Sequence, residues 1–127
     1  MSSTREKIGF IGLGKMGRPM VEHLKNAGYE VMVFDISSEL TTATSLEIKA
    51  IAAKNISEIG SYADIVITSL PNVSIVNEVV FGDEGLSSAM SSGNLLIDMS
   101  SCDPIKTQEI GNRLAESDID MIDAPIS

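Results

Sequence analysis

The sequence predicts an α/β fold in which helices cover both faces of a parallel sheet. Short apolar segments alternate with helical patterns along the whole chain. This alternation requires right-handed crossovers between parallel strands, which gives a doubly wound sheet. The length of 127 residues and the hydrophobic share of 43% suit a single folded domain with a modest core.

The first strand and the first helix flank a glycine-rich turn. The apolar segment Lys7–Ile11 predicts the strand, and it runs directly into Gly12, Gly14 and Gly17. The helical pattern that follows ends at the stop signal Asn26-Ala27-Gly28. Its apolar residues recur at three- and four-residue steps and are Met16, Met20, Val21, Leu24 and Ala27.

This strand, turn and helix predict a binding site for the pyrophosphate of a dinucleotide. Gly12 permits the tight turn, Gly14 lets the backbone approach the phosphates, and Gly17 lets the helix pack closely on the strand. The N–H groups at the start of the helix then face the bound anion. Because glycines at this spacing also occur in ordinary loops, the flanking strand and helix are needed to support the prediction. The turn residues expected to line the same site are Leu13, Lys15 and Met16.

An acidic residue follows the second predicted strand, Glu30–Phe34. Asp35 lies close to the offset of about 20 residues at which an acidic side chain binds the adenosine ribose. An acid there repels a 2'-phosphate, and the following Ile36-Ser37-Ser38 contains no arginine to neutralise one. We therefore expect the cofactor to be NAD rather than NADP. The alternative is that Asp35 is a surface acid in a turn.

The rest of the chain continues the alternation of strands and helices. Residues 63–70 have the continuous apolar character of a strand buried on both faces, and Pro71-Asn72 ends it. Asp103 before Pro104 predicts the capped start of a helix. The other expected elements are helices at 38–46, 57–62, 73–80, 86–90 and 104–116 and strands at 51–53, 95–98 and 119–124.

Three segments lie at the C-terminal ends of predicted strands. The carboxyl ends of parallel strands share one edge of the sheet, where ligands bind. They are Leu70-Pro71-Asn72, Asp98-Met99-Ser100-Ser101 and Asp123-Ala124-Pro125-Ile126-Ser127. Taken singly, each also has a structural interpretation. These interpretations are a turn, a loop before the Asp103 cap, and an acid at the end of a strand.

Together with the glycine turn, these segments resemble the signatures of the beta-hydroxyacid dehydrogenases. The matching motifs are G-F-I-G-L-G-x-M-G, S-L-P-N, I-D-M-S-S-x-x-P and I-D-A-P-I-S, in the family's order and spacing. The family includes 3-hydroxyisobutyrate dehydrogenases and tartronate semialdehyde (2-hydroxy-3-oxopropionate) reductases, and the pair Ser100-Ser101 is more similar to the latter. The resemblance covers essentially the whole chain and implies a Rossmann doubly wound sheet.

The resemblance also implies roles for individual residues. Backbone atoms around Leu70 and Pro71, with Asn72 beside them, would line the adenosine side of the NAD site. Ser101 would contact NAD near its nicotinamide end, and Ser100 would lie toward the substrate.

The resemblance further implies the chemistry. In this family hydride moves between C4 of the nicotinamide and the carbonyl of a short semialdehyde acid, with a lysine as general acid or base. Ser127 would begin a serine-glycine-glycine substrate segment, and the lysine and an all-helical domain follow that segment. No lysine of this chain lies in the lysine motif, so we assign no catalytic residue. We expect an inactive NAD-binding portion of an enzyme that is itself a homo-oligomer.

Composition excludes several other functions. The 18 acidic and 9 basic residues give a net charge of −9, which disfavours nucleic acid or an anionic membrane as a partner. The lone Cys102 and the lone His23 argue against a disulfide or a metal cluster. No apolar run approaches the ~18 residues of a membrane span, and the first residues lack a secretory signal. We therefore expect a cytoplasmic protein with a small-molecule substrate.

Two other functions stay open on the sequence alone. A Rossmann module can retain nucleotide binding for regulation or assembly without any catalysis. A reductase of the same fold can instead act on imines or on 6-phosphogluconate. Gly14 counts against a 6-phosphogluconate dehydrogenase, because those enzymes usually carry alanine at this position.

Overall fold

A six-stranded parallel sheet forms the centre of the molecule, in the order β3-β2-β1-β4-β5-β6. The structure is a computed structural model that describes residues 6–100 and 103–124. The strands are β1 (Lys7–Ile11), β2 (Glu30–Phe34), β3 (Ile51–Ala52), β4 (Ile65–Thr68), β5 (Leu95–Asp98) and β6 (Asp120–Asp123). The helices are α1 (Gly17–Asn26), α2 (Ser38–Ile48), α3 (Ile56–Tyr62), α4 (Val73–Phe81), α5 (Leu86–Ala89) and α6 (Pro104–Ala115). The predicted Rossmann doubly wound sheet is thereby confirmed.

The strand order places the glycine turn at the centre of the sheet. β1 pairs with both β2 and β4. The chain therefore builds the sheet from β1 to β2 and β3 on one side, and then crosses back to add β4, β5 and β6 on the other side of β1. The crevice beyond the carboxyl ends of β1 and β4 lies at this reversal of strand order, which is where ligands bind to doubly wound sheets.

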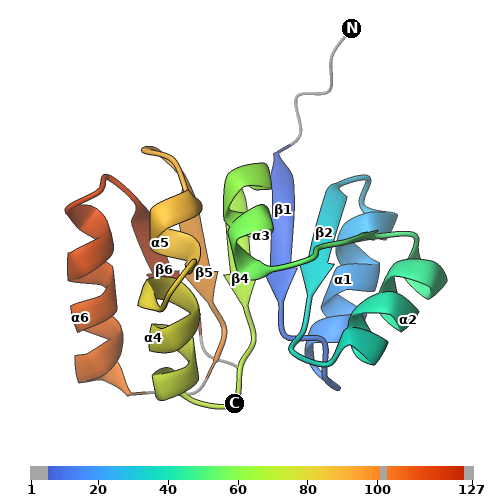
Figure 1. Cartoon of the computed structure of the whole chain (residues 1–127), viewed down its shortest axis with the longest axis horizontal. Coiled ribbons are helices and arrows are strands. Elements are labelled where there is room, and N and C mark those ends of the chain that lie inside the picture. The colour runs from blue at the N-terminus through green and yellow to red at the C-terminus, as the bar shows by residue number, and fades with distance from the viewer. Residues whose placement is uncertain (1–5, 101–102, 125–127) are drawn as a thin grey trace, which may run out of the picture.

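Each face of the sheet has its own apolar core. Ile59 of α3, Val76 of α4 and Leu114 of α6 pack with Val66 and Leu96 on one face. On the opposite face, α1 packs Val21 against strand residues that include Phe10 and Val33. Figure 1 shows α3, α4, α5 and α6 in front of the sheet and α1 behind it. This burial on both faces accounts for the continuous apolar character of the inner strands.

Some boundaries differ from those expected, for local reasons. The strand expected at 63–70 is shorter at both ends, because the Ala63 N–H bonds to the Ile59 carbonyl of α3 and the Leu70 N–H bonds to the Ser100 hydroxyl. The helix expected at 38–46 continues to Ile48 and ends at Lys49, which has a left-handed φ of 63°. No glycine marks that end in the sequence. Within the described residues, none of the helices is long and apolar enough to cross a membrane.

Candidate functional site

The glycine turn after β1 has the geometry that its spacing predicts. Gly12 has a φ of +105°, and a Cβ there would lie 2.0 Å from the Ser69 carbonyl oxygen of the neighbouring chain segment. A Cβ on Gly17 would lie 1.9 Å from the Gly12 carbonyl oxygen and 3.0 Å from the Phe10 ring. Both positions therefore require glycine if this turn and the contact between α1 and β1 are to form.

Gly14 differs from the other two glycines because it faces open space. A Cβ built on Gly14 meets no heavy atom within 4 Å. A side chain at this position would thus extend into the space beside the turn without disturbing the protein itself. This space is where the pyrophosphate of a dinucleotide is expected, so the turn fits the predicted group.

The start of α1 is left without a side-chain cap. Met16 stands at its N-cap position and makes no capping hydrogen bond. By contrast, Ser37, Asn55, Asn72 and Asp103 each accept a hydrogen bond from the first turn of α2, α3, α4 and α6. An uncapped helix start offers its N–H groups and the positive end of its dipole to an anion.

Asp35 is held beside the glycine turn by hydrogen bonds. Its Oδ2 accepts a hydrogen bond from the Leu13 N–H at 2.8 Å, and its Oδ1 accepts one from the Ser37 N–H at 2.8 Å. The Asp35 N–H donates to the Thr41 hydroxyl at 2.9 Å. The carboxylate is therefore fixed against the turn, and each oxygen retains a lone pair that can accept from a ribose hydroxyl.

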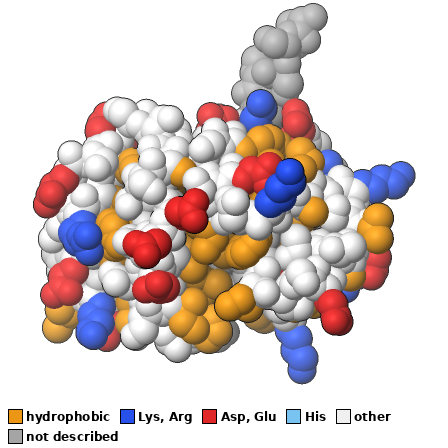
Figure 2. Space-filling view, in the orientation of Figure 1, with side chains coloured by type: hydrophobic (Ala, Val, Ile, Leu, Met, Phe, Trp, Pro, Cys, Tyr) orange, Lys and Arg blue, Asp and Glu red, His pale blue; other side chains and the backbone are white. Residues whose placement is uncertain are grey.

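An open cleft of about 780 Å³ extends from the glycine turn across the sheet edge. Its apolar walls come from the residues after β2 and β4 and from one side of α4, and Figure 2 shows the hydrophobic hollow that they form. Ile36, a residue that is 97% exposed, is part of the wall. The main apolar residues of the wall are Phe34, Ile36, Leu70, Pro71, Ile75 and Val79.

The charges that line this cleft are all negative among the described residues. Asp35, Glu78 and Asp83 contribute carboxylates, and no lysine or arginine lines it. On the other side of the turn, Arg18 of α1 forms an ion pair with Glu47 of α2. The guanidinium closest in sequence to the glycines therefore already has a carboxylate partner.

Buried hydrogen bonds join the loops after β4 and β5. The Thr68 hydroxyl donates to Asp98 Oδ1 at 2.9 Å, and the Ser100 N–H donates to the same oxygen at 3.1 Å. The Ser100 hydroxyl in turn accepts from the Leu70 N–H at 2.8 Å. Ser100, of which 4% is exposed, therefore fixes the backbone of Leu70, which lines the cleft.

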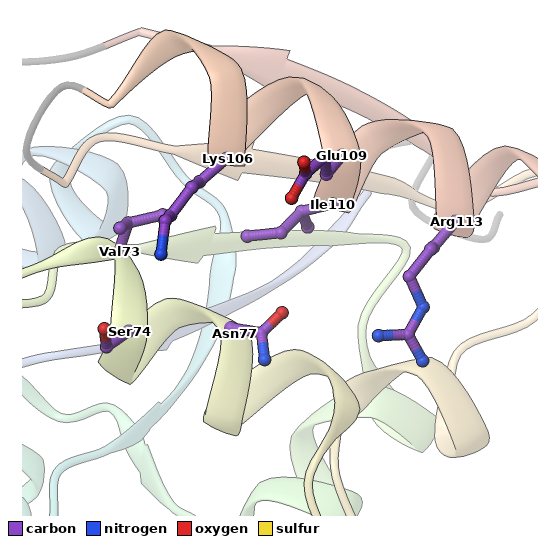
Figure 3. A pocket seen from close by; sticks show the side chains of 7 residues that line it. All are labelled: Val73, Ser74, Asn77, Lys106, Glu109, Ile110 and Arg113. Atoms are coloured by element: carbon purple, nitrogen blue, oxygen red, sulfur yellow. The ribbon is translucent and has the colours of Figure 1, made fainter.

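A second pocket, of about 300 Å³, lies between α4 and α6 and contains none of the residues predicted to bind NAD. Figure 3 shows polar side chains of both helices that project into it, among them Asn77, Lys106 and Glu109. The Arg113 guanidinium at its far end lies 3.8 Å from the centre of the Phe81 ring. This pocket adjoins neither the glycine turn nor Asp35, so we place the site in the larger cleft.

Comparison with known proteins identifies the family of this domain. The profile of a family described as the NAD binding domain of 6-phosphogluconate dehydrogenase matches residues 7–127. The chain belongs to this family of NAD-binding domains. The match covers the glycine turn, Asp35 and both loops of the hydrogen-bonded network.

Relatives of this NAD-binding domain include several beta-hydroxyacid dehydrogenases. It is 42% identical over 121 residues to 2-(hydroxymethyl)glutarate dehydrogenase of Eubacterium barkeri, covering 95% of this chain and 40% of the relative. It is 36% identical over 121 residues to 2-hydroxy-3-oxopropionate reductase of Escherichia coli, covering 95% of this chain and 41% of the relative. These relatives confirm the resemblance that the motifs indicate. The chain thus spans about 40% of the length of such relatives.

A solved structure supports the same conclusion. The 3-hydroxyisobutyrate dehydrogenase of Mycobacterium tuberculosis superposes with a TM-score of 0.90 at 27% identity, covering 98% of this chain and 41% of that one. The likeness therefore extends over nearly the whole of this NAD-binding domain.

The structure brings together only part of the predicted site. Gly12, Gly14, Asp35, Leu70 and Pro71 all line the larger cleft. The other predicted positions lie around it or outside the described residues. Leu13 and Lys15 line the pocket between α1 and α2, Met16 is 52% exposed at the start of α1, and Ser101 and Ser127 lie outside the described residues.

Asn72 has a structural role that its prediction did not include. Its Oδ1 accepts a hydrogen bond from the Ile75 N–H at 3.0 Å and so caps α4. Its contact with NAD stays a prediction. The same helix carries residues that sequence reasoning missed, namely Ile75, Glu78 and Val79 in the cleft wall. Their three- and four-residue spacing after Pro71 was the available signal.

Proposed function

We propose that this NAD-binding domain serves a dehydrogenase that moves hydride between nicotinamide and the β-carbon of a small carboxylic acid. The observation that supports this most is the continuous cleft formed by the glycine turn, Asp35 and the apolar wall beyond it. In this arrangement the pyrophosphate lies against the start of α1, and the adenosine ribose lies on Asp35. The base then lies between Ile36 and the Pro71 side of the cleft.

The charges favour NAD over NADP. A 2'-phosphate on the ribose would lie beside the Asp35 carboxylate, in a cleft whose described residues supply no cation. Arg18 is engaged with Glu47 and would have to leave this partner to neutralise the phosphate. Repulsion between two anions in a partly apolar cleft is weakly screened, so the unphosphorylated ribose is preferred.

The names of the relatives suggest the class of substrate. 2-(Hydroxymethyl)glutarate, 3-hydroxyisobutyrate and 2-hydroxy-3-oxopropionate each carry a terminal CH2OH or CHO group on the carbon that bears the carboxylate. We infer a substrate with this unit, oxidised from the alcohol to the aldehyde or reduced in the opposite direction. By resemblance, Ser100, Ser101 and Ser127 are the residues of this chain proposed to lie near it.

The residues of this chain are proposed to bind and orient NAD and the substrate. NAD, when bound, supplies the acceptor for hydride. The glycine turn and Asp35 hold the adenosine half, and the loops joined by Ser100 shape the edge at which the nicotinamide and substrate meet. No lysine of the chain occupies the family's proton-transfer motif. We therefore expect NAD binding without turnover from the 127-residue chain.

Calorimetric titration of the chain with NAD and NADP tests the proposal. We expect NAD to bind more tightly, and Asp35→Ala to weaken NAD by about tenfold or more, because it removes charge-assisted hydrogen bonds to the ribose. Asp35→Asn retains an acceptor for the Leu13 N–H but loses the negative charge. It should therefore narrow the ratio of the affinities for NAD and NADP.

The exposed acid Glu39, which lies outside the cleft, supplies the control. Glu39→Ala should change neither affinity, and circular dichroism should show all the variants to be folded. An unchanged ratio in both Asp35 variants would reject Asp35 as the ribose partner. Steady NADH oxidation by the 127-residue chain with 2-hydroxy-3-oxopropionate would contradict the absence of a catalytic group.

A further inference from the structure

The end of the cleft farthest along α4 is acidic. Glu78 lies one helical turn beyond Ser74, on the side of α4 that also carries Ile75 and Val79, and Asp83 lies just after the helix. Both carboxylates line the same cleft as Asp35. Figure 2 shows acidic side chains along one border of the hydrophobic hollow.

Both carboxylates are available to a ligand. Neither Glu78 nor Asp83 forms a side-chain hydrogen bond or an ion pair with any residue that the structure describes. The Glu78 side chain lies beside Gly82, where an added Cβ would lie 2.9 Å from the Glu78 Oε1. The glycine thus leaves room for the Glu78 carboxylate at the end of the cleft.

The polarity of the cleft differs between its parts. At one end the uncapped start of α1 presents N–H groups, after β2 Asp35 presents acceptors, and where α4 ends Glu78 and Asp83 present acceptors. A phosphate binds favourably only at the end formed by the start of α1, because the carboxylates of Glu78 and Asp83 repel it at the opposite end. A ligand that matches this order is anionic at one end and carries hydrogen-bond donors at the other.

The adenosine half of NAD has this order of groups. Its pyrophosphate is anionic, its ribose hydroxyls can donate to Asp35, and its adenine carries an exocyclic amino group that donates two hydrogen bonds. Hypoxanthine has the same ring shape but a carbonyl oxygen in place of that amino group. A carboxylate accepts from the amino group and repels the carbonyl oxygen.

We propose that Glu78, with Asp83 beside it, selects adenine by accepting a hydrogen bond from its exocyclic amino group. The proposal rests on the proposed function, because it requires NAD to lie with its adenosine half in this cleft. Apolar contacts with Ile36 and Pro71 hold any purine of this shape, whereas the carboxylates distinguish one purine from another. Glu78 is thus a specificity residue for the base and takes no part in hydride transfer.

Competing titrations with NAD and nicotinamide hypoxanthine dinucleotide test this selection. The two ligands differ at the exocyclic group that Glu78 is proposed to recognise and at the adjacent N1, which carries a hydrogen only in hypoxanthine. We expect the 127-residue chain to bind NAD at least about tenfold more tightly, since the wrong ligand leaves a carboxylate facing a carbonyl oxygen. Glu78→Gln should narrow this ratio severalfold, because its amide can turn an N–H toward the carbonyl oxygen.

Two further variants complete the experiment. Asp83→Asn should narrow the ratio less than Glu78→Gln, and Glu109→Gln on α6, outside the cleft, should leave it unchanged. A structural effect of Glu78 would change both affinities together, so the ratio isolates recognition of the base.

The outcomes separate the two proposals. Tight NAD binding with equal affinity for the hypoxanthine analogue, or a ratio that Glu78→Gln leaves unchanged, would overturn the selection of adenine alone. Failure of the folded wild-type chain to bind NAD at all would overturn the proposed function and this inference together.

Discussion

Gly14 and Gly17 separate cofactor binding from folding at the scale of single residues. An added Cβ on Gly14 meets nothing within 4 Å, whereas one on Gly17 would lie 1.9 Å from a backbone oxygen. Gly14→Val should therefore leave the protein folded and reduce the affinity for NAD by at least about tenfold, because the valine methyl groups would fill the space in which the pyrophosphate is expected to lie. Gly17→Val should lower the free energy of unfolding by roughly 3 kcal/mol or more.

Urea denaturation and calorimetric titration measure these two effects independently. Gly111→Ala is the matched control, because a Cβ there would lie 3.7 Å from its nearest neighbour, the Met121 sulfur on β6. It should leave NAD binding unchanged. Unaltered NAD affinity in folded Gly14→Val would show that the phosphates do not lie beside this residue.

The residues of the site were predictable from the sequence to different extents. Gly12, Gly14 and Asp35 were predictable because the turn imposes a fixed spacing on them. The buried bond from Thr68 to Asp98, and the contact of Ser100 with Leu70, join residues about 30 positions apart in sequence. Such distances depend on how two strands pair, and a single chain's local pattern does not contain them.

The contact between α3 and β2 gives the molecule an alkaline sensitivity at the scale of elements. Tyr62 at the end of α3 donates a hydrogen bond to the Glu30 carboxylate on β2 at 3.3 Å. Partial burial, followed by the negative charge of Glu30, raises the pKa of Tyr62 to about 12. The usual pKa of a tyrosine is about 10.

The raised pKa fixes the sign of the pH effect. Between about pH 10 and 12 the folded protein retains the Tyr62 proton while the unfolded chain has lost it, so the stabilisation falls as the pH rises through this window. We expect denaturation across this range to show a steeper loss of stability in the wild type than in Tyr62→Phe. Parallel losses in the two proteins would contradict the raised pKa.

Most elements were predictable from the sequence because their periodicity and caps are local. The strands Lys7–Ile11, Glu30–Phe34 and Leu95–Asp98 have the expected bounds, and Asp103 caps α6 as expected. The end of α2 was not predictable, because Lys49 adopts a left-handed conformation that glycine normally provides. The shortened β4 depends on the hydrogen bond from Leu70 to Ser100, which no local pattern indicates.

The whole molecule combines a net charge of −9 with a site for an anionic cofactor. In the proposed arrangement this conflict is resolved locally, because the phosphates would lie at the uncapped start of α1 while the acids of the cleft would face the ribose and the base. The doubly wound order was predictable from the alternation of strands and helices. The extent and the acidic end of the cleft were not, because they depend on how α4 lies beside the loop after β2.

Heteronuclear NMR of the uniformly labelled chain, titrated with NAD, tests this placement of the cofactor most directly. We predict that the largest changes in amide chemical shift fall on Gly12, Gly14, Lys15 and Gly17, with further changes around Ile36 and Ile75. Changes in chemical shift confined to the pocket between α4 and α6, around Asn77 and Lys106, would contradict the placement of NAD on the glycine turn.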